Sequence, residues 1–212
     1  MTKTLHYIFD PLCGWCYGAA AAVKAVDKAP NVALRLLPSG LFAAVGARPM
    51  DEDFAAYAWS NDQRIAGLTG QRFSERYRNE VLADRQQRFD SGPATLALSA
   101  VSLSSPAHEL EALEAIQQAR YVEGQDITRP DTLARLLKGL GLEAAAAGLL
   151  HSGAELLAAN RARIESAQTL LSQFGARGVP SFVLESDGRR ELLQSSALYA
   201  DPQAFAAQIA KA

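Results

Sequence analysis

Two short apolar runs flank a helical segment at the start of the chain. Residues 4–9 are apolar and rich in β-prone side chains, and Asp10 and Pro11 end them, which predicts a first strand. Residues 13–28 are rich in alanine and predict a helix, and residues 32–37 predict a second strand. Two strands joined by a crossover helix are expected to run parallel.

The middle of the chain has helical periodicity. From about residue 50 to about residue 175, apolar side chains recur three or four positions apart, as expected for helices with one buried stripe. Glycine and proline interrupt this pattern at several points. The clearest stripes are Phe73-Tyr77-Val81, Leu110-Leu113-Ile116, Leu133-Leu136-Leu137-Leu140 and Ile164-Ala167-Leu171-Phe174.

The β pattern returns near the end of the chain. Residues 181–185 predict a third strand, and residues 190–194 predict its partner, because Asp-Gly at 187–188 is typical of a hairpin turn. Asp201 and Pro202 then predict the N-cap and the first residue of a short last helix.

Neither β-containing end is large enough to bury both faces of a sheet. We therefore expect the two ends to form one four-stranded sheet flanked by helices, in an α/β fold that carries a large α-helical insertion. This interpretation places the sheet domain at residues 1–47 and 160–212, and the inserted helical domain at residues 48–159.

The composition is that of a globular protein, and it narrows the choice of partners. The 212 residues are 49% hydrophobic and 21% charged, which is enough apolar material for a core. The net charge of −2 argues against a nucleic-acid partner. No apolar run reaches the roughly 18 residues of a membrane helix, and the first residues lack the apolar core of a secretory signal. We therefore expect a cytoplasmic protein with no membrane partner.

Cys13 and Cys16 are the only cysteines, and they follow a predicted strand and open a predicted helix. Residues three apart lie on one face of a helix, so the two sulfur atoms can bond. The free amides and partial positive charge of a helix N-terminus favour the thiolate, which is the attacking species in disulfide exchange. The motif therefore predicts that Cys13 forms a mixed disulfide with a substrate and that Cys16 resolves it.

Three other roles for this cysteine pair stay open. One is half of a zinc site, but zinc usually needs four ligands, and His6, His108 and His151 are scattered along the chain. The others are an iron–sulfur cluster shared between two chains and a pair of inert core cysteines. The position between strand and helix favours the redox pair, and we expect no metal.

Gly178, Val179 and Pro180 lead the third predicted strand. Proline is tolerated at the first residue of a strand. The residues alone favour a trans proline that terminates the helix ending near Gly175, whereas a cis proline would be a deliberate structural feature.

Together, Cys-x-x-Cys after the first strand, a helical insertion and Gly-Val-Pro before a late strand resemble the thioredoxin superfamily. The insertion resembles the DsbA family, which also includes FrnE-like proteins, and YIFDPLCGWCYG is most similar to the members described as predicted protein-disulfide isomerases. The resemblance implies a thioredoxin-like fold with a large α-helical insertion and a cis Val179–Pro180 bond beside the cysteines. It also implies that the Val179 backbone pairs with substrate and that Pro180 helps to keep metals off the thiols.

The activity that the resemblance implies is thiol–disulfide exchange, as an oxidoreductase or isomerase acting on protein or small-molecule disulfides. It needs no bound cofactor, and glutathione is a candidate co-substrate. Gly14 and Trp15, in the turn between the cysteines, differ from the Pro-His of DsbA and the Gly-Pro of thioredoxin, so the redox direction is not carried over. In a reducing cytosol, a reductase, an isomerase or a stress-linked exchange reaction is favoured over net oxidation.

Two other functions are compatible with this architecture. Kappa-class glutathione transferases and 2-hydroxychromene-2-carboxylate isomerases share the inserted helices, but they usually carry a single serine where this chain has Cys13 and they lack Cys16. A binding or adaptor module built on the helical block would need no thiols. The sequence is also compatible with either a monomer or a homodimer.

Several side chains near the motif have two interpretations. Asp10 is expected to cap the first helical turn or end the strand, and the alternative is a buried carboxylate that modulates Cys13. Trp15 is expected to be exposed and to contact substrate, Tyr17 to pack in the core, and Arg177 to be solvated. Core packing is expected, with a substrate-facing groove as the alternative, for the aromatic residues Phe54, Tyr57, Trp59, Phe73 and Tyr77.

Overall fold

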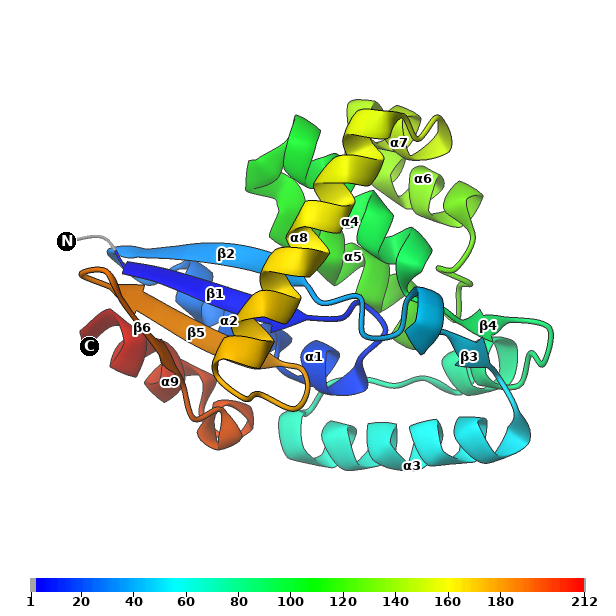
Figure 1. Cartoon of the computed structure of the whole chain (residues 1–212). Coiled ribbons are helices and arrows are strands. Elements are labelled where there is room, and N and C mark those ends of the chain that lie inside the picture. The colour runs from blue at the N-terminus through cyan, green and yellow to red at the C-terminus, as the bar shows by residue number, and fades with distance from the viewer. Residues whose placement is uncertain (1–2, 212) are drawn as a thin grey trace.

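A four-stranded mixed sheet lies at the centre of the computed structural model, which describes residues 3–211 (Figure 1). Its strands are β1 (Lys3–Phe9), β2 (Val32–Pro38), β5 (Ser181–Ser186) and β6 (Arg189–Leu192). The order across the sheet is β2-β1-β5-β6. β1 pairs parallel with β2 and antiparallel with β5, and β5 pairs antiparallel with β6. The four expected strands and the parallel first pair are therefore confirmed.

The residues between β2 and β5 are mainly helical, as expected. The α-helices of the whole described chain are α1 (Gly14–Gly18), α2 (Ala20–Asp27), α3 (Glu52–Thr69), α4 (Gly92–Ser104), α5 (Glu109–Tyr121), α6 (Pro130–Gly139), α7 (Glu143–Leu150), α8 (Ala154–Gln173) and α9 (Pro202–Lys211), of which α3 to α8 lie in that region. A π-helical turn, η2 (Tyr77–Leu82), follows α3. α4, α5, α6 and α7 cluster beyond one end of the sheet (Figure 1).

Helices cover both faces of the sheet. α2 and α9 pack together on one face, and α8 crosses the other face (Figure 1). Neighbouring strand residues point to opposite faces, so Tyr7 and Phe9 join the core on the side of α2 and α9. Ile8 points the other way and packs with Ala167 and Leu170 of α8. β1 is therefore buried on both sides, and it ends shortly before the active turn, residues 13–16.

The predicted turn and cap near the end of the chain are confirmed. Asp187 and Gly188 join β5 to β6 with φ values of 51° and 74°, the left-handed conformations that a two-residue hairpin turn requires. The carboxylate of Asp201 accepts a hydrogen bond from the amide of Ala204 at 2.9 Å, which caps the start of α9.

Two details differ from the sequence prediction. The helix expected over residues 13–28 divides at Ala19 into α1 and α2. Two short strands, β3 (Arg48–Pro49) and β4 (Arg88–Phe89), form an antiparallel pair that the sequence pattern does not predict. Two residues are too few to produce a periodic signal.

α8 joins the helical block to the sheet. It runs without a break through residue 160, where the expected domain boundary falls, and it contacts both α4 and β2. Arg163 of α8 donates to the carbonyl of Leu36 in β2 at 2.9 Å and forms an ion pair with Glu109 of α5. The division into a sheet domain and an inserted domain stays a prediction.

Candidate active site

The two cysteines lie at the start of α1. Cys13 is the N-cap residue of this helix, and Cys16 lies one turn later. Both are free thiols, 8% and 1% exposed respectively, and they approach each other to about 3.4 Å. Burial, reinforced by the neighbouring Cys13, raises the pKa of Cys16 well above its ordinary value. The pair therefore consists of one thiol at the rim of the site and one beneath it.

The loop before β5 lies against Cys13. The Val179–Pro180 peptide bond is cis. The Cys13 thiol donates to the carbonyl of Val179, with 3.6 Å between sulfur and oxygen. Val179 and Pro180 are half-buried, and Gly178 before them is exposed. The fold thus brings the second sequence motif into direct contact with the first, although the two are far apart in the chain.

The residues between the cysteines are less exposed than the sequence suggested. Trp15 is half-buried, and its ring packs edge-on against Tyr199, with the ring centroids 5.3 Å apart. The guanidinium of Arg64 lies 5.6 Å above the same ring. The expectation of a freely exposed Trp15 is wrong, because the segment before α9 folds back onto it. Gly14 is also half-buried.

Asp10 does not cap α1. It is fully buried, and its carboxylate accepts hydrogen bonds from the amides of Leu12 and Phe42 and from the hydroxyl of Ser91, at 2.9, 3.1 and 2.7 Å. Burial raises the pKa of this carboxyl. Asp10 therefore ties the end of β1 to the loop after β2, through Phe42, and to the insertion, through Ser91. The modulating role toward Cys13 stays a prediction.

Tyr17 and Arg177 lie where the sequence predicts, Tyr17 in the core and Arg177 at the surface. Tyr17 is buried and its ring stacks on Tyr121, with centroids 4.7 Å apart, and meets the ring of Phe73 edge-on. Arg177 is exposed. Tyr17 is therefore a packing residue.

A cavity of about 140 Å³ opens beside Cys13. Aromatic side chains dominate its wall, and they come mainly from the insertion. Among the aromatic residues that had two interpretations, Phe54, Tyr57 and Tyr77 line this cavity, whereas Phe73 is buried in the core and Trp59 lies outside the cavity. Three of these residues therefore line a cavity at Cys13, and the substrate-facing role of that cavity stays a prediction.

Sequence reasoning missed two charged residues at this cavity. Asp62 of α3 lines it, and Arg120 of α5 lies behind it, fully buried against the rings of Tyr77, Phe89 and Tyr121. A signal for Asp62 was present, because it falls in the apolar stripe of α3, one turn before the buried Ile65. No local signal marks Arg120, because only the tertiary fold brings α5 to the site.

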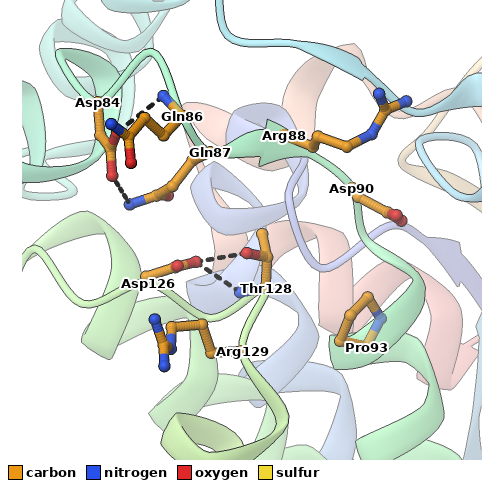
Figure 2. Close-up of a pocket in the computed structure, with 9 residues that line it drawn as sticks. All are labelled: Asp84, Gln86, Gln87, Arg88, Asp90, Pro93, Asp126, Thr128 and Arg129. Carbon is orange, nitrogen blue, oxygen red and sulfur yellow. Dashed lines mark hydrogen bonds between the residues drawn. The ribbon is translucent and has the colours of Figure 1, made fainter.

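A second, more polar cavity of about 410 Å³ lies elsewhere on the insertion (Figure 2). Its acidic side chains accept hydrogen bonds from near neighbours in the chain. Asp84 accepts from the backbone amide of Gln86 and the side-chain amide of Gln87, and Asp126 accepts from the backbone amide and the hydroxyl of Thr128. β4 separates the two cavities, since Arg88 lines the polar one and Phe89 the one at Cys13. None of the residues that line the polar cavity is a cysteine.

Comparison with known proteins identifies the family. The sequence profile of the DSBA-like thioredoxin domain matches residues 4–208. The chain belongs to the DsbA-like thioredoxin family. The match spans both halves of the sheet and the insertion, so the expected family and the thioredoxin-like fold are confirmed. It also supports the expected enzyme class, a protein-disulfide oxidoreductase of the DsbA type.

Solved structures resemble this DsbA-like chain over its full length. The cytosolic disulfide reductase DsbM from Pseudomonas aeruginosa is 34% identical, with a TM-score of 0.88 and 98% of this chain and 97% of that chain covered. DsbM with GSH gives 33% identity, a TM-score of 0.86 and 98% coverage of both chains. The oxidoreductase DsbA from Xylella fastidiosa, at 16% identity, a TM-score of 0.57 and coverage of 99% and 85%, shares the fold alone. No curated protein sequence matches the chain.

Residues 3–211 of this DsbA-like protein include no helix that is long and apolar enough to cross a membrane. Over the same residues, no group of three or more His, Cys, Asp or Glu side chains is arranged to hold a metal ion.

Proposed function

We propose that this DsbA-like protein is a thiol–disulfide oxidoreductase in which Cys13 attacks and Cys16 resolves. The observation that carries the proposal is the approach of the two thiols to about 3.4 Å at the start of α1, beside the Val179 carbonyl and an aromatic cavity. Cys13 borders the cavity and is open to a substrate from that side, whereas Cys16 is beneath it. A thiolate needs access to attack, which assigns the first step to Cys13.

The exchange runs in two steps. The Cys13 thiolate attacks one sulfur of a substrate disulfide, a Cys13–substrate disulfide forms, and the other substrate sulfur leaves as a thiolate that takes up a proton. The Cys16 sulfur, after losing its proton, attacks Cys13, which releases the second substrate thiolate and leaves a Cys13–Cys16 disulfide. Two thiols of a reductant then return the pair to the reduced state and leave as a disulfide.

Glutathione suits this reductant role. DsbM, at about one third identity over the full length of both chains, has been solved with GSH. The same similarity to a cytosolic disulfide reductase supports the reducing direction and a cytoplasmic location for this chain. In this reaction, Val179, Pro180 and Trp15 contact the substrate beside Cys13, Gly14 shapes the turn between the cysteines, and no cofactor is needed.

Two matched variants test the proposal. Cys13→Ser is expected to abolish the reduction of insulin disulfides by glutathione, because the attacking sulfur is lost. Cys16→Ser keeps that sulfur and is expected to accumulate a mixed disulfide on Cys13, visible by mass spectrometry. An unchanged rate in Cys13→Ser would refute the proposal. If the wild-type protein showed no exchange activity but turned over a transferase or isomerase substrate with glutathione, the kappa-class alternative would be favoured instead.

A further inference from the structure

Two buried charged side chains lie around the Cys13 cavity, and the exchange steps described above do not use them. Asp62 is 4% exposed and Arg120 is 1% exposed, and both belong to the inserted helices. Charged groups are costly to bury unless they are paired or hydrogen-bonded. Asp62 lines the cavity at Cys13, and Arg120 lies behind the aromatic wall of that cavity.

One oxygen of Asp62 is fixed and the other faces the active turn. Oδ2 accepts a hydrogen bond from the hydroxyl of Tyr77 at 2.9 Å. Oδ1 lies so close to Gly14 that a Cβ atom at that residue would collide with it. In the part of the chain that the structure describes, no donor bonds to Oδ1, and Asp62 lines the same cavity as Cys13. A free acceptor therefore borders the space that a substrate thiol enters.

The surroundings of Asp62 balance its two protonation states. Burial favours the neutral acid and raises the pKa of Asp62 to about 7, while the Tyr77 hydroxyl and the Arg120 guanidinium favour the carboxylate. The other titratable groups that face it are Tyr121 and Cys13. Among residues 3–211, Arg120 forms no ion pair with Asp62, and its Nε and Nη2 have no hydrogen-bond partner, so its positive charge acts on Asp62 without direct contact.

We infer that Asp62 is the acid–base residue for the small thiol that reacts at Cys13. When a thiol RSH attacks the Cys13–Cys16 disulfide, its proton moves to the Asp62 carboxylate and its sulfur bonds to Cys13. The bond between the two cysteine sulfurs breaks, and its electron pair leaves on Cys16, which takes up a proton. In the reverse reaction, protonated Asp62 returns the proton to the thiolate that leaves Cys13. This inference rests on the proposed function.

The pH dependence of one rate constant tests the inference. The oxidised protein is mixed with reduced glutathione between pH 5.5 and 9, and the loss of the Cys13–Cys16 disulfide is followed. In the wild-type protein the rate is expected to rise through about pH 7, where Asp62 ionises, and then to level off. Asp62→Asn is expected to be roughly 100-fold slower at pH 7, the size of a general-base contribution. The rate of Asp62→Asn should keep rising until the glutathione thiol itself ionises near pH 8.5, so the difference between the two rates becomes smaller at high pH.

Asp53→Asn is the matched control, because Asp53 is an exposed carboxylate in the first turn of the same helix. It is expected to follow the wild-type curve. An Asp62→Asn curve that equals the wild-type curve, or lies below it by one factor at every pH, would overturn the inference, because a purely structural role predicts no change of shape.

Tyr77→Phe supplies a second test that keeps the carboxyl group, should Asp62→Asn fail to fold. It removes the hydroxyl that favours the carboxylate, so the rise in rate is expected to move to higher pH. An unmoved rise would count against Asp62. Failure of the proposed function would look different, because the wild-type protein would then form no Cys13–Cys16 disulfide to reduce.

Discussion

Cys13 and Cys16 lie in different surroundings although only two residues separate them. Cys13 borders the aromatic cavity and donates to the Val179 carbonyl, whereas Cys16 lies beneath it and is almost fully buried. Burial keeps Cys16 protonated over the physiological range, because it raises the pKa of that thiol. This difference supports an attacking role for Cys13 and a resolving role for Cys16.

Asp62 is expected to make the stability of the protein depend on pH. Its pKa is about 7 in the folded protein and 3.8 as the ordinary value, so between these values the folded state binds more protons than the unfolded state. Stability therefore falls as pH rises from about 4 to about 7. Asp62→Asn removes this loss and is expected to be more stable than wild type at pH 8 by roughly 4 kcal/mol, at 1.36 kcal/mol per pKa unit.

Urea unfolding at pH 4 and pH 8 measures this effect. At pH 4 the two unfolding free energies should differ by less than about 1 kcal/mol, because Asp62 is protonated in the folded state and still partly protonated in the unfolded state. A difference of the same size at both pH values would show that the substitution acts through packing and that the carboxyl group is not held near neutrality.

At the scale of elements, the active turn depends on a close contact between α1 and α3. A Cβ atom at Gly18 would lie 2.7 Å from Cγ2 of Ile65 and 3.5 Å from Cγ2 of Thr69. Gly18→Ala is therefore expected to destabilise the protein by about 1–3 kcal/mol, the usual cost of overpacking.

Gly67→Ala is the control within α3, because nothing lies within 4 Å of a Cβ at that position. It should stabilise the helix by roughly 0.5–1 kcal/mol. The two variants can be compared by urea denaturation. Equal stability of Gly18→Ala and Gly67→Ala would mean that α3 moves away from α1 without cost, and that the contact does not hold the active turn.

The elements were largely predictable, and the cavity was not. Strands, hairpin and helices follow from local periodicity and turn chemistry, which are properties of neighbouring residues. The packing of Tyr199 on Trp15, and of Arg120 behind the cavity, depends on segments far apart in the chain, so no local pattern contains it. Asp62 is an intermediate case. Its position in an apolar stripe can be seen in the sequence, but its close approach to Gly14 depends on how α3 packs against α1.

At the scale of the whole molecule, the site forms where the sheet meets the insertion. The end of β1, the start of α1 and the loop before β5 supply the two thiols and the Val179 carbonyl. α3 and β4 supply the cavity wall. Asp10, at the end of β1, bonds to Phe42 and to Ser91, which follows β4 closely in the chain. The sheet therefore carries the reacting atoms, and the insertion shapes the space that a substrate enters.

The central claim is that Cys13 and Cys16 exchange disulfides as a pair. Equilibration of the protein in buffers with different ratios of reduced to oxidised glutathione, followed by alkylation and mass spectrometry, tests it most directly. We expect both thiols to disappear together in one two-electron transition that leaves an internal disulfide. A glutathione adduct on Cys13 alone, or free thiols at every ratio, would contradict the account.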